Sequence, residues 1–356
     1  MRLYSYIIMR ILMIVPTLFG LTFIVFILSR AGGPNVVISA YINPHIPYAL
    51  QKAQLMREFH LNGPLWVQYL YYLSGLLHGD WGYTKTGVYS GPVTGAIAVF
   101  LPNTIQLSIA AFVITAIVGI PLGTISGYKK DSFTDQVTRI IAFIGISLPI
   151  FWLAQMLSLA FATNTVSPYL NVLPLDGTVN PFLLTNLNWV SSQGLSSPTH
   201  VMLIDSIIHG DLPVFFSALS HLVLPATTLA FTTIAPILRY MRASVAEVLN
   251  QDFVRIGRSK GLPEKLVIKR YIRRNALLPV MTIMGLVFAG LLAGVVVIEA
   301  LFDYPGMGYW AVQSLINYNT GGIMGVTLVF GLILVFTNLV VDIIYAFLDP
   351  RIRTGE

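Results

Sequence analysis

The sequence predicts an all-α polytopic membrane protein with six transmembrane helices. Of its 356 residues, 55% are hydrophobic and only 10% are charged, whereas about a quarter of the residues of a soluble domain carry a charge. So few charges cannot cover a water-exposed surface, so the excess of apolar side chains must face lipid. Six uncharged runs are long enough to cross the hydrocarbon core, and the basic residues gather in particular loops between these runs.

The first apolar run, 11–29, lies between Arg10 and Arg30. It is long and lacks a clear small-residue cleavage site, so we interpret it as a retained span and not as a signal peptide. Several later runs contain proline, which membrane helices tolerate as kinks because neighbouring groups satisfy the freed carbonyls. The remaining predicted spans are 101–128, 137–162, 219–238, 276–301 and 321–347.

Lysine and arginine set the orientation of the spans, because cytoplasmic loops carry an excess of both. With a cytoplasmic N-terminus, all but four of the 21 basic residues fall on the inner side. The four exceptions all lie in the first outer segment: Arg30, Lys52, Arg57 and Lys85. We therefore expect a multi-pass protein of the cell (plasma or inner) membrane with both termini in the cytoplasm.

The spans divide the chain into an N-terminal transmembrane helix at 1–30, an extracytoplasmic region at 31–100 and a core of five spans at 101–356. The region 31–100 is rich in Gly, Pro and aromatic residues, which indicates short helices packed on the membrane face. Within the core, 163–217 is a long outer insertion without Lys or Arg, and 239–274 is a basic inner loop.

The sequence lacks the signatures of several kinds of chemistry. Cysteine is absent, which excludes disulfides, thiolate metal sites and a cysteine nucleophile. The six histidines show no metal-ligand spacing, and no G-x-x-x-x-G-K-[ST] motif is present to cradle a phosphate. We predict no catalytic, cofactor or metal site in this chain, so any ATP hydrolysis must belong to a separate subunit. Because the net charge of +6 comes from loops that set topology, we expect no nucleic-acid partner.

Two acidic residues, Glu299 and Asp342, fall within the predicted spans. A charge at membrane depth is costly and therefore a functional candidate. Both residues lie near the ends of their spans, where water or headgroups reach them, which favours a structural capping role. A proton-coupled carrier would place carboxylates near the membrane midplane, and the sequence shows none there.

The inner loop carries the most informative pattern. Gly261 suits the position just after a helix, Pro263 suits the first position of a new helix, and Glu264 suits its first turn. This spacing predicts two short helices joined by a sharp corner, an element that could receive a mechanical push on a membrane domain. The alternative, that the loop's charge only fixes orientation, explains the basic residues but not the Gly-x-Pro corner.

The inner loop reads RIGRSKGL at 255–262 and RNALLP at 274–279. In these stretches the chain resembles the inner-membrane permease subunits of binding-protein-dependent ABC importers of the dipeptide/oligopeptide class, which carry R-x-A-R-A-K-G-L followed by R-N-A-L-L-P. The resemblance extends over nearly the whole chain and includes LPNT at 101–104, EALF at 299–302 and PGMG at 305–308. Of the importer-wide signature E-A-A-x-x-x-G only Gly261 survives, and Gly257 in place of alanine should loosen that helix.

The resemblance implies the fold of a type I ABC importer permease with a cytoplasmic coupling helix. It implies a second homologous permease, two ABC ATPase subunits that hold ATP and Mg, an extracytoplasmic substrate-binding protein and surrounding membrane lipid as partners. The residues expected to couple to the ATPases are Arg255, Gly257, Arg258, Lys260, Gly261, Leu262, Pro263 and Glu264. The candidates for an outer gate or loop are Glu299, Phe302, Pro305, Gly306 and Gly308.

The expected function is that of a non-catalytic permease subunit of an ATP-driven importer of short peptides. The same importer type could instead carry oligosaccharides or nickel. A different class, a secondary carrier or channel, would predict internal repeats, broken half-helices or buried carboxylates, and the sequence indicates none of these. A membrane enzyme or a structural scaffold would need a site or an interaction domain for which the sequence gives no signal.

Overall fold

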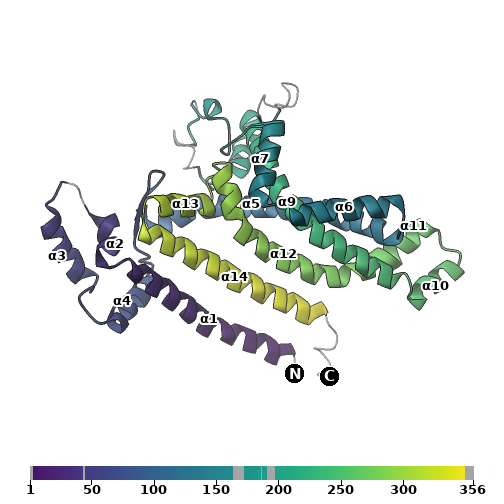
Figure 1. The fold of residues 1–356 in the computed structure, drawn as a ribbon, viewed down its shortest axis with the longest axis horizontal. Coiled ribbons are helices and arrows are strands. Elements are labelled where there is room, and N and C mark those ends of the chain that lie inside the picture. The colour runs from purple at the N-terminus through teal and green to yellow at the C-terminus, as the bar shows by residue number, and fades with distance from the viewer. Residues whose placement is uncertain (1–2, 43–44, 163–171, 186, 191–196, 349–356) are drawn as a thin grey trace.

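The computed structural model describes residues 3–42, 45–162, 172–185, 187–190 and 197–348. Long helices run roughly side by side along one axis of the molecule (Figure 1). Over the described residues the single sheet is a two-stranded hairpin. The predicted all-α class is therefore confirmed.

Five helices are long and apolar enough to cross a membrane. They contain the first, second, fourth, fifth and sixth predicted spans, and their bounds are α1 Leu3–Ala31, α5 Val93–Tyr128, α9 Leu212–Val248, α12 Arg273–Leu301 and α14 Thr320–Leu348. Three of them extend well beyond the prediction, because α1 begins at residue 3, α5 begins at residue 93 and α9 runs from 212 to 248. Hydropathy detects only the part of a helix that is apolar enough for the membrane core.

The third predicted span is broken. Residues 137–162 were expected to form one helix, but the chain bends by 110° between α6 Phe133–Ser147 and α7 Ile150–Phe161. Leu148 has extended dihedrals because the ring of Pro149 disfavours the helical conformation of the residue before it. The α6–α7 pair makes a sixth span only if both halves cross as one bent unit.

Residues 31–100, which the sequence predicts to lie outside, consist mainly of short helices, as predicted. They are α2 Pro34–Ile38, the 3₁₀ turn η1 Ser39–Tyr41, α3 Tyr48–Glu58 and α4 Leu65–Leu77. The strands β1 Tyr83–Lys85 and β2 Ser90–Pro92, which the sequence did not predict, pair antiparallel with Thr84 opposite Gly91. The predicted outer connector 302–320 contains a further helix, α13 Met307–Ile316.

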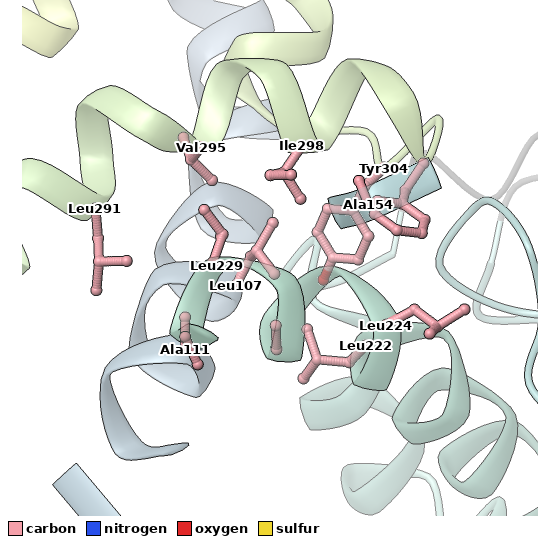
Figure 2. Packing of buried hydrophobic residues seen from close by; sticks show 13 residues of the cluster. Leu107, Ala111, Ala154, Leu222, Leu224, Leu229, Leu291, Val295, Ile298 and Tyr304 are labelled. Carbon is pink, nitrogen blue, oxygen red and sulfur yellow. The ribbon is translucent and has the colours of Figure 1, made fainter. Parts of the chain in front are cut away.

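The core is built where α5 and α9 pack closely together. Gly119, Gly123 and Gly127 recur every four residues on α5, a spacing that lets the backbones of membrane helices approach. A Cβ on Gly123 would lie 2.8 Å from the carbonyl oxygen of Leu238, and one on Gly127 would lie 2.7 Å from that of Arg242. Farther along the axis, α12 joins this pair, and apolar side chains from the three helices point toward one another (Figure 2).

The described part of the insertion 163–217 is folded. It contains the 3₁₀ turn η2 Pro181–Leu183 and α8 Met202–Ile208, and residues 163–171, 186 and 191–196 lie outside the described structure. Trp189 stacks on His209 with ring centroids 4.6 Å apart, and the buried Asp205 accepts hydrogen bonds from the backbone N–H of Thr199. A small apolar cluster underneath consists of Val179, Leu184, Met202, Val214 and Ala218.

Candidate functional site

Residues 239–274, the predicted inner loop, form the sharp corner that their sequence predicts. We call residues 252–266 the corner; it comprises α10 Asp252–Ser259, the turn 260–263 and α11 Glu264–Leu266. Gly261 has a φ of +71°, a left-handed value that glycine adopts without strain, and its N–H donates to the carbonyl of Arg258 over 2.9 Å. Pro263 precedes the first helical residue instead of occupying it, so the predicted position is corrected by one residue.

The corner continues without a break into the fifth long helix. A π-helical turn, η3 Val267–Ile272, follows α11 and leads directly into α12. Wide turns of this kind occur frequently at functional sites. Any displacement of the corner is therefore applied to the end of α12 and not to a flexible linker.

The buried face of the corner packs into an apolar cluster. Val254 of α10 is fully buried and packs with Val267 and Ile272 against side chains of α9, among them Met241 and Val245. Gly257 is also buried, but a Cβ there would find its nearest neighbours at 3.9 Å, an ordinary contact. Alanine would therefore fit at 257, and the glycine contributes flexibility instead of space.

Glu264 ties the two helices of the corner to the end of α5. Its Oε1 accepts hydrogen bonds from Arg258 Nη2 over 2.7 Å and from the Tyr128 hydroxyl over 3.0 Å. The bond to the Glu264 carboxylate raises the pKa of Arg258 above its ordinary value. Both charged side chains are partly exposed, so the ion pair fixes geometry more than it adds stability.

The exposed face of the corner carries both apolar and basic side chains. Phe253 and Ile256 are 37% and 54% exposed, and both stand one helical turn apart on α10. The sequence prediction did not single out these two, although an apolar pair spaced i, i+3 among basic residues is a recognisable signal. Among the predicted coupling residues, Leu262 is half-buried. The exposed ones are Arg255, Arg258, Lys260, Gly261 and Pro263.

A second predicted group assembles around Glu299, near the opposite end of α12. The fully buried carboxylate accepts hydrogen bonds from the Thr104 hydroxyl over 2.7 Å and from the backbone N–H of Gly308 and Tyr309 over 2.6 and 3.3 Å. The Thr104 hydroxyl in turn accepts from the N–H of Met307 over 2.7 Å. We call these five residues the Glu299 cluster.

The Glu299 cluster caps the first turn of α13, whose N–H groups have no partner within the helix. This confirms the capping role favoured for Glu299. The motif residues around it share the arrangement: the Asn103 amide donates to the Pro305 carbonyl over 3.1 Å, and the side chain of Phe302 is buried in the core. A Cβ on Gly306 would overlap the Glu299 carboxylate, so only glycine fits there.

Asp135 was not predicted as a site residue, yet it is fully buried at the inner end of α6. It accepts hydrogen bonds from Arg242 Nε and Nη2 over 2.6 and 2.8 Å, from the Ser126 hydroxyl and from the N–H of Asp131. These contacts join the C-terminal end of α5, the first turn of α6 and the C-terminal part of α9. The sequence signal was Ser132-x-x-Asp135, a capping pattern at the start of a helix, which the structure shows in the bond from Asp135 N–H to Ser132.

The sequence led us to expect neither broken half-helices nor buried carboxylates, and both expectations are wrong. The α6–α7 span is broken, and Glu299 and Asp135, besides Asp205 of the insertion, are fully buried. Glu299 and Asp135 both lie toward helix ends, and their oxygens are occupied by structural hydrogen bonds. The side chain of Asp342 lies outside the described residues. Within the described ranges, no three His, Asp or Glu side chains gather in a way that could hold a metal ion.

Comparison with known proteins decides the family. A family profile described as the inner membrane component of binding-protein-dependent transport systems matches residues 119–354. The matched range includes the corner and every residue of the Glu299 cluster except Thr104. The chain belongs to this family. Its members' fold, that of a type I ABC importer permease, is the class predicted from the sequence.

Named relatives of this permease family cover most of the chain. A probable D,D-dipeptide transport system permease protein of Escherichia coli K12 is 37% identical over 85% of this chain and 84% of its own length. A dipeptide transport system permease protein of the same strain is 34% identical over 98% of each chain. An oligopeptide transport system permease protein of Bacillus subtilis is 33% identical over 98% of this chain and 99% of its own.

Proposed function

We propose that this permease imports short peptides, delivered by an external binding protein, and that ATP hydrolysis by partner subunits drives it. The substrate class is supported by the relatives, each of which is named for the transport of dipeptides or oligopeptides. The partners would be a second homologous permease and two ATPases that hold ATP and Mg, so this chain would itself be non-catalytic.

The observation that carries the proposal is the geometry of the corner. It projects from one end of the helix bundle, beyond the ends of α1 and α14 (Figure 1). One face of the corner is buried against α9 and the corner runs on into α12, whereas Phe253 and Ile256 are exposed, with no covering partner among the described residues. A protruding apolar pair flanked by basic residues suits a groove on another subunit. A force exerted there would move α9 and α12 together.

The orientation of the permease follows from the same end of the molecule. The first residues of α1 and the last described residues of α14 lie toward the corner along the long axis (Figure 1), and the basic residues are concentrated there. We therefore propose that this end is cytoplasmic. The insertion 163–217, with its folded α8 segment, would then lie on the outer side near the docking site of the binding protein.

A secondary carrier would need carboxylates that gain and lose protons near the midplane. The hydrogen bonds of Glu299 and Asp135 instead join helix ends to one another, which favours the ATP-driven alternative. Uptake of oligosaccharides or nickel by the same importer type would leave this geometry unchanged. Ligand carried by the native binding protein, identified by mass spectrometry after purification, distinguishes these cargoes.

Replacement of Gly261 tests the role of the corner. A Cβ at this position meets no atom of the chain within 4 Å, so tryptophan would be strained only by the positive φ, which costs about 1 kcal/mol. Asparagine tolerates this conformation and is the matched control. We expect Gly261→Trp to insert and fold normally but to lose ATPase binding or the stimulation of ATP hydrolysis by loaded binding protein, and with it peptide uptake.

Gly261→Asn should retain coupled uptake. If Gly261→Trp also supports normal uptake and stimulated ATP hydrolysis, the corner is not the contact through which ATP acts. Loss of folding in both variants, seen as aggregation on size-exclusion chromatography, would contradict the open space observed around Gly261.

A further inference from the structure

The outer helix α4 has an exposed apolar face that the transport function does not explain. Its 13 residues include no Asp, Glu, Lys or Arg. Trp66, Leu70 and Leu77 are 67%, 55% and 80% exposed, and their i, i+4, i+11 spacing puts them on one side of the helix. Single exposed apolar residues are ordinary, but an uncharged helix with an aromatic and two leucines on its open side marks an interaction surface.

The opposite face of α4 is fixed to α1. The buried Tyr69 ring packs against Phe19, Phe23 and Phe26 of α1, with centroids 5.3–5.5 Å apart, and its hydroxyl is hydrogen bonded to Thr22 over 2.9 Å. Gln68 accepts a hydrogen bond from Arg30 over 2.9 Å and donates to the Gly63 carbonyl. The position of α4 is therefore set by the outer part of the first transmembrane helix.

The level of this attachment can be measured along α1. Arg10 and Arg30 are 20 positions apart, or about 30 Å at 1.5 Å per residue, which is the thickness of the hydrocarbon core. Arg30 therefore marks the outer boundary of the core. Because Gln68 contacts Arg30 and Tyr69 contacts Phe19, α4 packs along α1 from that boundary to about 16 Å below it, which is roughly the depth of one leaflet.

We propose that α4 lies in the outer leaflet, with Trp66, Leu70 and Leu77 immersed at the boundary between headgroups and acyl chains. Interfacial helices bury their apolar faces about 5–10 Å into this boundary, and tryptophan and tyrosine are enriched at this level. The surface is continuous with α1, where Phe23, a direct neighbour of Tyr69, is itself 46% exposed. The partner of this face is thus a lipid surface, and α4 holds the outer end of α1 at a fixed depth.

Spin labelling tests the proposal directly, because the chain has no cysteine of its own, so a single cysteine introduced at a chosen position is its only thiol to label. Nitroxides would be attached at positions 70 and 77 of the full chain, in the assembled transporter in lipid nanodiscs. Reference labels would be Val15, exposed in the middle of α1, and Gln54, exposed on α3. The measured quantity is the ratio of collisions with oxygen, which enriches in lipid, to collisions with a water-soluble nickel chelate.

The proposal expects ratios at 70 and 77 between those of the two references and several-fold above that of Gln54. A ratio equal to that of Gln54 would place the face in water, and protection from both reagents would place it under another protein; either result overturns the proposal. As a measurement without labels, acyl-brominated lipids should quench part of the native fluorescence, and Trp66→Phe should reduce the quenched part, whereas Trp152 of α7, which is 44% exposed, stays in place. Unchanged quenching in Trp66→Phe would also count against the proposal.

Discussion

Replacing Thr104 by valine should loosen the Glu299 cluster without creating a cavity. Valine has nearly the shape of threonine but lacks the hydroxyl, which donates to Glu299 and accepts from the N–H of Met307, both over 2.7 Å. All of these groups are buried. The substitution therefore leaves one carboxylate oxygen and one backbone N–H without their partner, while the other oxygen keeps its bonds to Gly308 and Tyr309.

The expected loss follows from the number of orphaned groups. A buried polar group left unsatisfied costs about 1–3 kcal/mol, so the two together should lower the free energy of unfolding by about 2–6 kcal/mol. Thr228→Val is the matched control. Thr228 is equally buried, but its hydroxyl donates only to the carbonyl of Leu224 in its own helix. That carbonyl keeps its helical N–H partner in the variant, so the free energy of unfolding should fall by at most about 1 kcal/mol.

Thermal unfolding of the purified transporter in nanodiscs, followed by tryptophan fluorescence, measures the difference. Trp310 of α13 is fully buried and stacks on Phe100 with centroids 5.8 Å apart, so it reports on the helix that the Glu299 cluster caps. We expect the Tm of Thr104→Val to fall well below that of Thr228→Val. Equal Tm values for the two variants would refute the capping role of Thr104 and Glu299.

Three further predictions concern the other end of the bundle and the orientation. Asp135→Ala leaves an uncompensated guanidinium in a largely buried position, so the free energy of unfolding should drop by about 3–5 kcal/mol, measurable by chemical denaturation in nanodiscs. Replacing Phe253 and Ile256 together by serine should weaken co-purification of the ATPases while leaving the Tm unchanged, because both side chains are exposed; retained ATPase would contradict their docking role. In sealed right-side-out vesicles, an impermeant thiol reagent should label a cysteine at Ser90 but not one at Ser259, and the reverse pattern would invert the proposed topology.

The parts of the fold that the sequence predicted depend on local properties. Hydropathy along a run is a sum over neighbouring residues, so the five long helices were all found. The break before Pro149 was indicated only as a kink, because a proline in a membrane helix can bend it slightly or end it, depending on the packing around it. The hairpin at 83–92 was missed because three-residue strands carry too little periodicity to stand out.

The candidate sites likewise divide into one that local sequence predicts and others that depend on contacts between distant residues. The corner was predicted because Gly261 and Pro263 act on the backbone within three residues of each other. The partners of Glu299 could not be predicted, because Thr104 lies 195 positions away along the chain. The pair of Asp135 and Arg242 is separated by 107 positions, and each residue alone looks like an ordinary charge near the end of a span.

The glycines show why a motif match does not by itself give a mechanism. Gly261 is required by its positive φ, in open space, where no neighbour limits a side chain. Gly306 is required by space, because a Cβ would overlap the Glu299 carboxylate while its backbone is extended. Gly123 permits the backbones of α5 and α9 to approach. A larger side chain at 306 or 123 should therefore lower the stability of the isolated chain. One at 261 costs the isolated chain only about 1 kcal/mol of backbone strain and acts mainly through a neighbouring subunit, so the two kinds of defect separate by whether the permease unfolds or merely uncouples.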